Sequence, residues 1–393
     1  MSNSTPVQAV AVPQETPSSP QQPSVLPGRV MSIDALRGFD MFWLMNGRAI
    51  AIALAALAGG WWNQTARTQL SHSDFGGHWV GFTFWDFIAP LFLFVIGLSM
   101  PYSISKRLER GDSRRALYRH IVQRTAVLIL LGWVLNNWLA FQFPLRLSGV
   151  LPRVALSYFV AALIVMGAST RGQVAWTGGI LLGYWAAMAL IPVPGYGAGV
   201  YTAAGNLSGY IDRLLLPGKY CCAPYVPYGD HMGILGTFPS AMHVMLGVFC
   251  GYLVRSALPQ GRKLLILAGG GAASVVLGLV WGQVFPIIMP LWTSSFVLFT
   301  NGLSMLLFAL FYWIIDMRGY RKWAFPFVVI GMNAITIYVV QELIHFRDIA
   351  DIFFRGVILH SGGLAHLVSA VTLVGTEWVF LYILYRKKIF IRF

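Results

Sequence analysis

Apolar residues occur in long blocks separated by short polar joints along most of the chain after residue 30. A helix needs about 20 consecutive apolar residues to cross a bilayer, and blocks of this length recur along the sequence. The pattern predicts spanning helices at approximately residues 34–58, 80–103, 119–140, 152–169, 173–193, 239–256, 263–284, 293–316, 324–345 and 364–386. The expected fold class is therefore all-α, a polytopic membrane helical bundle of about ten transmembrane helices.

Composition supports this class, because hydrophobic residues make up 57% of the 393 residues and charged residues only 11%. The net charge of +14 would suit anionic partners if it were spread evenly, but the basic residues cluster beside apolar blocks. When the amino terminus is placed in the cytoplasm, the basic joints fall on the cytoplasmic side. We therefore expect both termini in the cytoplasm and the lipid bilayer as partner, and we do not expect nucleic acid.

Residues 1–30 are rich in Pro, Ser, Gln and Thr and contain no Lys or Arg before Arg29. They also lack an apolar core of signal-peptide length. This composition is typical of a disordered amino-terminal tail, which leaves residues 31–393 as one transmembrane domain.

The stretch from His72 to Met100 combines a polar, Gly-containing loop with an apolar run long enough to span a membrane. The loop holds His72 and His78, and one carboxylate, Asp86, lies inside the apolar run. An ionised carboxylate in hydrocarbon costs several kcal/mol unless it is paired, protonated or in contact with water. A loop histidine is the obvious partner, and a histidine–carboxylate pair is typical of proton transfer.

Further polar residues lie within or beside the predicted spans. Asp34 and Arg37 share one side of the first span near the cytoplasm, where they could pair with each other or Arg37 could contact a phosphate. The other candidates for substrate or cofactor binding are Arg153, Asp230, Thr237, Asn333 and Glu342. Most of these fall in the outer half of the bundle, which predicts a reaction chamber. The alternative is polar contacts that hold the helices together.

Two other features bear on the chemistry. The three cysteines do not stand at metal-ligand spacing, so we expect no metal. The long outer joint, residues 194–238, is rich in Gly, Pro and Tyr. Its aromatic side chains would suit a sugar or another amphipathic acceptor, and an aromatic belt at the membrane surface is the alternative.

With these residues in view, the chain resembles the family of heparan-α-glucosaminide N-acetyltransferase and its bacterial relatives. The matching pieces include SIDALRGFDMFW, GFTFWDFIAPLFLFVIG, SGVLPRVALSYFV, DHMGILGTFPS and GMNAITIYVVQEL, in family order. The resemblance implies transfer of an acetyl group from cytosolic acetyl-CoA to an amino sugar across the membrane, with a loop histidine as the catalytic residue. It also implies location in the bacterial cytoplasmic membrane.

Carried over, the family's carboxylate is Asp86. The histidine is His72, because HSDF at residues 72–75 fits the first half of the family pattern and GGHW follows as an insertion. His78, which is closer to Asp86 along the chain, is the alternative. Pro152 and Met232 depart from the family pattern and leave the acceptor open, as either an amino sugar or another glycan.

The expected function is thus a membrane-bound N- or O-acetyltransferase in which a neutral imidazole accepts the acceptor's proton or carries the acetyl group itself. Acetyl-CoA is expected to approach from the cytoplasm, near Arg37, with its pantetheine arm passing Asn333. The alternative is a proton-coupled transporter or lipid-linked sugar flippase that uses the same groups as a proton relay. A homodimer is left open.

Overall fold

The computed structural model describes residues 30–73, 79–109, 111–137, 145–221 and 225–391. The predicted amino-terminal tail, apart from Val30, and His78 lie outside these residues. The described part is all-α, as predicted, and contains no sheet; Val193 and Gly197 form an isolated bridge in a loop.

Seven helices among the described residues are long and apolar enough to cross a membrane. They are Met31–Ala58, Phe84–Ile104, Val150–Gly167, Thr237–Arg255, Gln260–Trp281, Ser294–Met317 and Gly362–Arg386. The bent pair Phe325–Met332 and Ala334–Leu343 makes an eighth if it counts as one span. The protein is therefore a multi-pass membrane protein.

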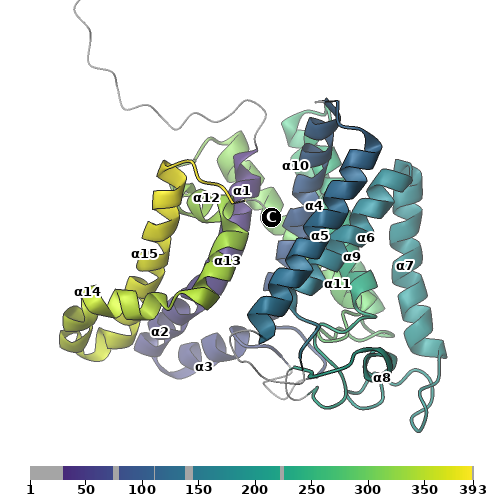
Figure 1. The fold of residues 1–393 in the computed structure, drawn as a ribbon, viewed down its shortest axis with the longest axis horizontal. Helices are drawn as coiled ribbons and strands as arrows, with labels where there is room; N and C mark the ends of the chain where they lie inside the picture. Colours follow the sequence, from purple (N-terminus) through teal and green to yellow (C-terminus); the bar gives the residue numbers. More distant parts are fainter. Residues whose placement is uncertain (1–29, 74–78, 110, 138–144, 222–224, 392–393) are drawn as a thin grey trace, which may run out of the picture.

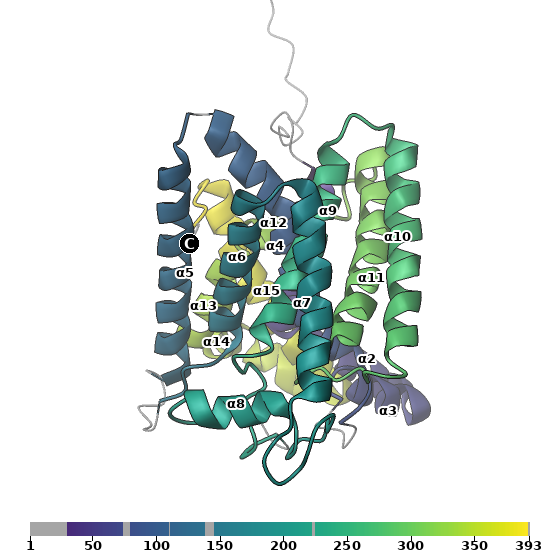
Figure 2. The same cartoon turned by 90° about the vertical axis from the view of Figure 1, so that its right-hand side faces the viewer.

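Ten spans were expected, and the two remaining predictions fall on helices of lower hydropathy. The prediction for residues 119–140 corresponds to α5 (Arg114–Asn137), which begins with several basic residues. The prediction for residues 173–193 corresponds to α7 (Thr170–Leu190), which contains several polar and glycine residues. Both run beside the candidate spans (Figure 2), so the count of ten remains a prediction.

The helices form two groups (Figure 1). One group holds α1 (Met31–Phe42), α2 (Arg48–Ala58), α12 (Phe325–Met332), α13 (Ala334–Leu343), α14 (Phe346–His360) and α15 (Ala365–Arg386). The other holds α4 (Phe84–Glu109), α5, α6 (Val150–Gly167), α7, α9 (Thr237–Arg255), α10 (Gln260–Trp281) and α11 (Ser294–Phe311). Helix α4 packs against α1 of the first group and against α9 and α11 of its own group.

Glycines fix the position of α4 against α9. A Cβ atom added at Gly97 would lie 1.9 Å from the Val244 carbonyl oxygen, and one added at Gly247 would lie 2.1 Å from the Phe94 carbonyl oxygen. Only residues without a side chain allow the two backbones to approach so closely, a common device in membrane helix packing. The helix that carries Asp86 is therefore held tightly within the bundle.

Two chain breaks shape the first helix group. Between α1 and α2, the turn Trp43–Gly47 departs from regular helix, with Asn46 at φ 66° in the left-handed region that asparagine tolerates better than most residues. Between α12 and α13 the axis bends by 72° at Asn333. At both breaks the regular helical hydrogen bonding is interrupted. Backbone groups and the Asn46 or Asn333 amide can therefore form hydrogen bonds with other segments.

A folded cap covers the ends of the helices on the face that carries the His72 loop. It is built from residues 191–221 and 225–236 and includes α8 (Leu207–Leu215), which lies across the bundle end (Figure 2). The Tyr225 side chain is fully buried, and its hydroxyl donates to Asn206 Oδ1 at 3.0 Å. At least this aromatic residue of the long joint therefore forms the interior of the cap itself.

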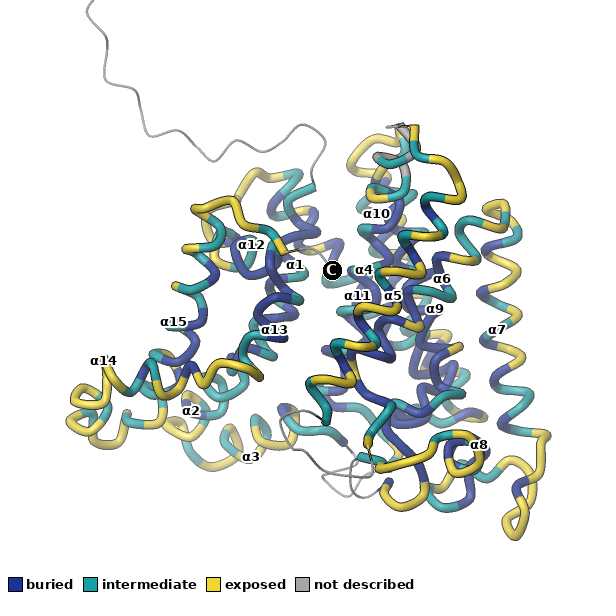
Figure 3. The backbone as a smooth tube through the Cα atoms, in the orientation of Figure 1, coloured by how far each residue is buried: buried dark blue, intermediate teal, exposed yellow. Residues whose placement is uncertain are grey.

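The outward faces of the peripheral helices are apolar. On α10, Leu265 is 72% exposed and Val280 is 64% exposed, and α7 shows exposed stretches along its length (Figure 3). Exposed apolar surface of this extent is expected where lipid chains replace water as the surroundings. The polar groups described next lie instead between helices or beneath the cap.

Candidate functional site

His72 and Asp86 are in direct contact. The Nδ1 atom of His72 lies 2.7 Å from Asp86 Oδ1, and the Asp86 side chain is fully buried while the His72 side chain is 22% exposed. When Nδ1 carries the imidazole proton, Nε2 presents the lone pair that can accept a proton. The contact therefore places a base, oriented by a carboxylate, at the start of α4.

Local sequence explains how Asp86 is held. It lies in the first turn of α4, where its Oδ2 atom accepts hydrogen bonds from the Thr83 backbone N–H at 3.1 Å and the Ser73 backbone N–H at 3.3 Å. A carboxylate that accepts the N–H before a helix forms half of a capping box and favours the positive end of the helix dipole. The Thr83 hydroxyl donates to the Ser71 carbonyl at 2.6 Å and ties the His72 loop to the same turn.

Aromatic and imidazole rings surround His72. Its ring centre lies 5.9 Å from that of His231 and 6.4 Å from that of Trp85. His231 is buried and belongs to the cap, and its own ring packs against Tyr225. A second imidazole thus faces the first across the boundary between the cap and the helices.

His72 lines a cavity of about 170 Å³ between the two helix groups. The other lining side chains are almost all apolar: Met41, Leu44, Trp85, Ile88, Ala89, Phe92, Val150, Leu151, Val154, Met232, Met289, Ile335 and Tyr338. An apolar cavity with one convergent base is the usual setting for chemistry on a small group. His72 is the titratable base at this cavity.

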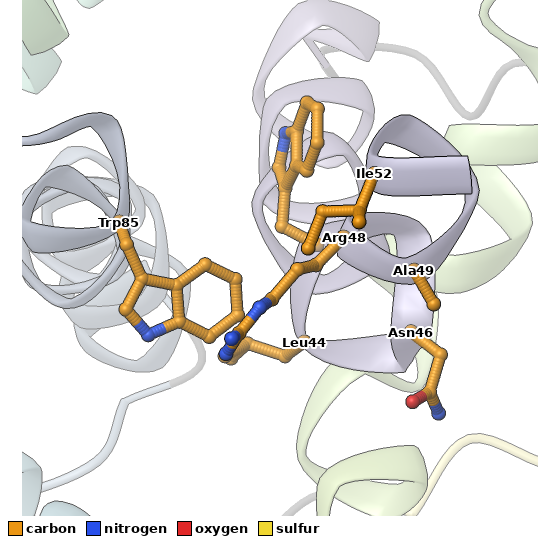
Figure 4. Close-up of a pocket in the computed structure, with 7 residues that line it drawn as sticks. Leu44, Asn46, Arg48, Ala49, Ile52 and Trp85 are labelled. Carbon is orange, nitrogen blue, oxygen red and sulfur yellow. The ribbon is translucent and has the colours of Figure 1, made fainter. Parts of the chain in front are cut away.

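A second cavity, of about 320 Å³, adjoins the first, since Leu44 and Trp85 line both. Arg48 reaches from the start of α2 across this cavity toward Trp85 (Figure 4), with its Cζ atom 5.0 Å from the ring centre. Trp43, Asn46, Ala49 and Ile52 complete the lining. Trp85 thus lies within 5.0 Å of a cation, measured to the Arg48 Cζ atom, and its ring centre is 6.4 Å from that of His72.

Asp230, predicted from sequence, is the centre of the cap's polar network. It is buried and accepts from Arg146 Nε at 2.9 Å and Nη2 at 2.8 Å. Burial alone would raise the pKa of Asp230, but the hydrogen bond and positive charge of Arg146 bring this pKa below its usual value. Asp230 therefore orders the cap as a charged partner of Arg146.

The pKa of Asp212, on α8, is shifted in the opposite direction to that of Asp230. Burial raises its pKa to about 6, although its carboxylate accepts backbone N–H groups from Ile234 at 2.9 Å and Asp230 at 3.2 Å. A carboxyl group that is half-protonated near pH 6 makes the cap sensitive to mildly acidic conditions.

Three other predicted residues lie apart from the His72 cavity lining. Arg153, in the first turn of α6, is buried; it donates to the Gly233 carbonyl at 2.7 Å and lies over the Trp292 ring. Thr237 is buried at the first position of α9, and Glu342 is exposed in the last turn of α13. Arg153 fastens the cap to α6, and the roles predicted for Thr237 and Glu342 in substrate binding remain predictions.

Asp34 and Arg37 lie near the start of α1, at the opposite end of the bundle from the His72 loop (Figure 1). The Arg37 Nη1 atom is 3.4 Å from Asp34 Oδ1, and Nη2 donates to Ser99 Oγ on α4 at 2.5 Å. The predicted pairing between Asp34 and Arg37 is therefore present. It also links α1 to α4 at the end expected to face the cytoplasm.

Asn333 is buried at the break between α12 and α13, and its amide holds the carboxy-terminal segment. Its Nδ2 donates to the Ile389 carbonyl at 3.1 Å, and its Oδ1 accepts from the Ile391 N–H at 3.2 Å. Contact between this amide and a cofactor, as predicted from sequence, would require residues 389–391 to move.

Sequence reasoning did not single out His231, Arg48, Asp40 or Glu377. Asp40 is fully buried on α1, with no hydrogen-bond partner for either oxygen in the described part of the chain. Glu377 is buried on α15 and accepts from Asn46 Nδ2 at 3.4 Å. A charged residue inside an apolar run was the available signal for the two carboxylates.

No group of three His, Cys, Asp or Glu residues that could hold a metal occurs in the described ranges.

Comparison with known proteins identifies distant relatives. A family model described as a domain of unknown function (DUF5009) matches residues 29–143, a range that includes His72 and Asp86. The chain is 28% identical to heparan-alpha-glucosaminide N-acetyltransferase of Homo sapiens over 423 aligned residues, which cover 93% of this chain and 60% of that protein. The Mus musculus protein of the same name is also 28% identical, with 92% and 61% covered.

The chain thus spans about three-fifths of the length of the curated relatives it matches. The resemblance predicted from sequence motifs is confirmed as a distant homology that extends over nearly the whole chain.

Proposed function

We propose that this protein is a transmembrane acyltransferase that moves an acetyl group from cytosolic acetyl-CoA to an amine or hydroxyl of an extracytoplasmic sugar. The observation that carries the proposal is the 2.7 Å contact between His72 and the buried Asp86 at the edge of an apolar cavity. The distant homology to an N-acetyltransferase supports the same class of reaction.

In the proposed reaction, His72 Nε2 accepts a proton from the acceptor's amine or hydroxyl as the heteroatom attacks the thioester carbonyl carbon. The new C–N or C–O bond forms, the C–S bond breaks, and the imidazolium returns its proton to the CoA thiolate. Asp86 holds Nδ1 protonated and stabilises the imidazolium that forms in the first step. General-base catalysis of this kind contributes roughly 10²–10⁴-fold to the rate.

The cavity dimensions agree with a small acyl group. Sites for drug-sized ligands enclose roughly 300–1,000 Å³, whereas the cavity at His72 measures about 170 Å³. Its apolar side chains suit an acetyl group and the adjoining thioester, and the nucleotide part of the donor would lie outside it. Arg37, at the opposite end of the bundle, is the candidate contact for the donor's phosphates.

The proposal includes the topology that this reaction requires. The bundle crosses the inner membrane of a bacterium with both termini in the cytoplasm, and α5 and α7 complete ten spans. The His72 loop and the cap then face outward, and Arg37 and the basic joints face the donor. Reporter fusions at the two termini and in the cap test this arrangement directly.

The function is tested with purified protein, labelled acetyl-CoA and a panel of amino sugars and glycans. The proposal predicts acceptor-dependent release of free CoA and labelled product, and loss of both in His72→Ala with normal membrane insertion. A wild-type protein that never consumes acetyl-CoA, yet moves a labelled solute across vesicles, would favour a proton-coupled transporter or a lipid-linked sugar flippase instead. Retained activity in His72→Ala with loss in His78→Ala would move the catalytic role to His78.

A further inference from the structure

The cap contributes a second imidazole to the surroundings of His72. His231 is buried, with 4% of its surface exposed, and its ring centre lies 5.9 Å from that of His72. The same ring packs against Tyr225, with 6.3 Å between the ring centres. His231 therefore contacts both the interior of the cap and the base of the proposed reaction.

The backbone around His231 is held on both sides. The Asp230 carboxylate accepts from the Met232 N–H at 2.8 Å, and the Gly233 carbonyl accepts from Arg153 at 2.7 Å. The His231 N–H itself donates to a backbone carbonyl elsewhere in the cap at 3.1 Å. A side chain on backbone held in this way keeps a defined position. Met232 lines the His72 cavity, so the held segment reaches the site.

The proton balance of the proposed reaction needs a second base when the acceptor is an amine. An alkylammonium group, R–NH₃⁺, is protonated at neutral pH and has no lone pair. It loses one proton before its nitrogen can attack and another after the C–N bond has formed. His72 returns only the second of these protons to the CoA thiolate. The overall reaction, R–NH₃⁺ and acetyl-CoA to the amide, CoA and H⁺, therefore leaves one proton for another group to take.

We propose that His231 takes this first proton, which reaches it from His72. His72 Nε2 accepts the proton from R–NH₃⁺ and passes it to the His231 ring, which leaves His72 unprotonated as the base for the second proton. The 5.9 Å between ring centres suits transfer through one bridging water. His231 then releases the proton to water on the outer side between turnovers.

His231 acts on the substrates through His72, so it is a positioning residue for the proton. The inference rests on the proposed acyltransferase function and adds the route by which the surplus proton leaves. The competing role is packing, since a flat ring between Tyr225 and His72 would also support the cap.

Two replacements separate proton transfer from packing. His231→Phe keeps a flat ring but cannot accept a proton, and His231→Ala removes the ring and leaves room for a small base. With purified protein, acetyl-CoA and glucosamine, kcat of both variants should fall by about 10²-fold, the lower end of what general acid–base catalysis contributes. The KM for both substrates should change little. Thermal unfolding in detergent reports whether the cap stays folded, and His231→Phe carries the test if His231→Ala does not fold.

Added imidazole provides a readout that packing does not affect. With the protein-free rate subtracted, imidazole in the assay should raise kcat of His231→Ala by about ten-fold, because a free base takes the proton in place of the missing ring. Wild type should not respond, and neither should His231→Phe, whose ring fills the space. The control variant is His345→Phe. His345 is exposed directly before α14 and lies outside both cavities, so its replacement should leave kcat unchanged, with and without imidazole.

Other results overturn the inference while the proposed function stands. Full kcat in His231→Phe would show that only the ring's packing matters, and so would a loss in His231→Ala that imidazole does not reverse. A raised KM for glucosamine with unchanged kcat would make His231 part of the acceptor site. A wild-type protein that consumes no acetyl-CoA with any acceptor would instead overturn the proposed function, and the inference with it.

Discussion

The His72 imidazole and the Asp86 carboxylate meet at 2.7 Å although the two residues are 14 positions apart and belong to different structural elements. Asp86 projects from the first turn of α4, whereas His72 precedes that helix in a loop. The loop is tied back by the Ser73 N–H on Asp86 Oδ2 and by the Thr83 hydroxyl on the Ser71 carbonyl. The carboxylate therefore positions both the imidazole and the backbone that carries it.

Replacement of Asp86 by Asn tests its effect on catalysis. Asparagine retains the shape and one acceptor oxygen, but it removes the negative charge that stabilises the imidazolium. We expect kcat to fall by roughly 10²–10⁴-fold with little change in KM for either substrate. Steady-state kinetics of the purified variant provide the measurement.

Thr83→Ser is the matched control for Asp86→Asn, because serine keeps the hydroxyl that bonds the Ser71 carbonyl. It should retain activity within a few-fold. If Asp86→Asn keeps full kcat while His72→Ala is inactive, His72 acts without a carboxylate partner and the assigned role of Asp86 is wrong.

A second prediction concerns the pair formed by Arg146 and Asp230. Asp230 is buried and accepts two hydrogen bonds from the guanidinium, so Arg146→Met leaves a carboxylate without its positive partner within the cap. Loss of one partner of a buried pair costs about 3–5 kcal/mol. We expect a clear drop in Tm for Arg146→Met, measured by thermal unfolding in detergent.

The double variant Arg146→Met, Asp230→Asn decides whether charge is the cause. Removal of the carboxylate should restore part of the lost Tm, because no unpaired charge remains. A double variant that is less stable than the sum of the two single changes would show that packing, and not charge, holds this part of the cap.

A third prediction follows from the raised pKa of Asp212. Its folded-state pKa of about 6 lies above the ordinary value near 3.8, so its protonated form favours the folded state. This contribution is fully present below about pH 4 and is lost as pH rises through 6. Its upper limit is roughly 3 kcal/mol. The Tm of wild type, taken relative to that of Asp212→Asn, should therefore fall from pH 5 to pH 7.

Thermal unfolding of both proteins at matched ionic strength checks this sign. Asp230, whose pKa is lowered, contributes in the opposite direction in both proteins, so comparison of the two curves reports Asp212 together with its repulsion from Asp230. A Tm of wild type that rises relative to that of Asp212→Asn as pH increases would mean that the Asp212 carboxylate is stabilised in its charged form.

The sequence predicted a contact between Asp86 and a loop histidine because each half has a local signal. Asp86 is a lone carboxylate in an apolar run, and His72 lies in the loop directly before it. The helices were predictable for the same reason, since apolar block length reports the bilayer directly. Helices α5 and α7, whose hydropathy is lower, are not among the helices found long and apolar enough to cross a membrane.

Other site residues depend on how distant segments pack. His231 reaches His72 only because the cap folds over the bundle end, and Arg146 finds Asp230 across 84 positions of sequence. Arg48 lies well inside the predicted span 34–58, but its position over Trp85 depends on the bend at Asn46, which turns α2. No periodicity along the chain carries this information.

A fourth prediction uses the glycine contact between α4 and α9. Gly247→Ala would push a methyl group into the Phe94 carbonyl of α4, and overpacking of this kind costs about 1–3 kcal/mol. Gly269→Ala on α10 meets no atom within 4 Å and should be neutral or slightly stabilising. Thermal unfolding and size-exclusion profiles of the two variants provide the comparison. Equal stability would mean that α4 and α9 can separate without cost.

The fifth prediction concerns Asn333 and the carboxy-terminal segment. The Asn333 amide makes two hydrogen bonds to residues 389–391, each worth about 0.5–1.5 kcal/mol net. Asn333→Ala and a truncation after Lys388 should each lower the free energy of unfolding by about 1–3 kcal/mol. Both changes remove the same two hydrogen bonds. The combined variant should therefore have the same free energy of unfolding as the less stable of the two single variants. Additive losses would mean that the tail and the amide stabilise the bundle independently. A KM for acetyl-CoA that falls on truncation would show that residues 389–391 compete with the donor at this break.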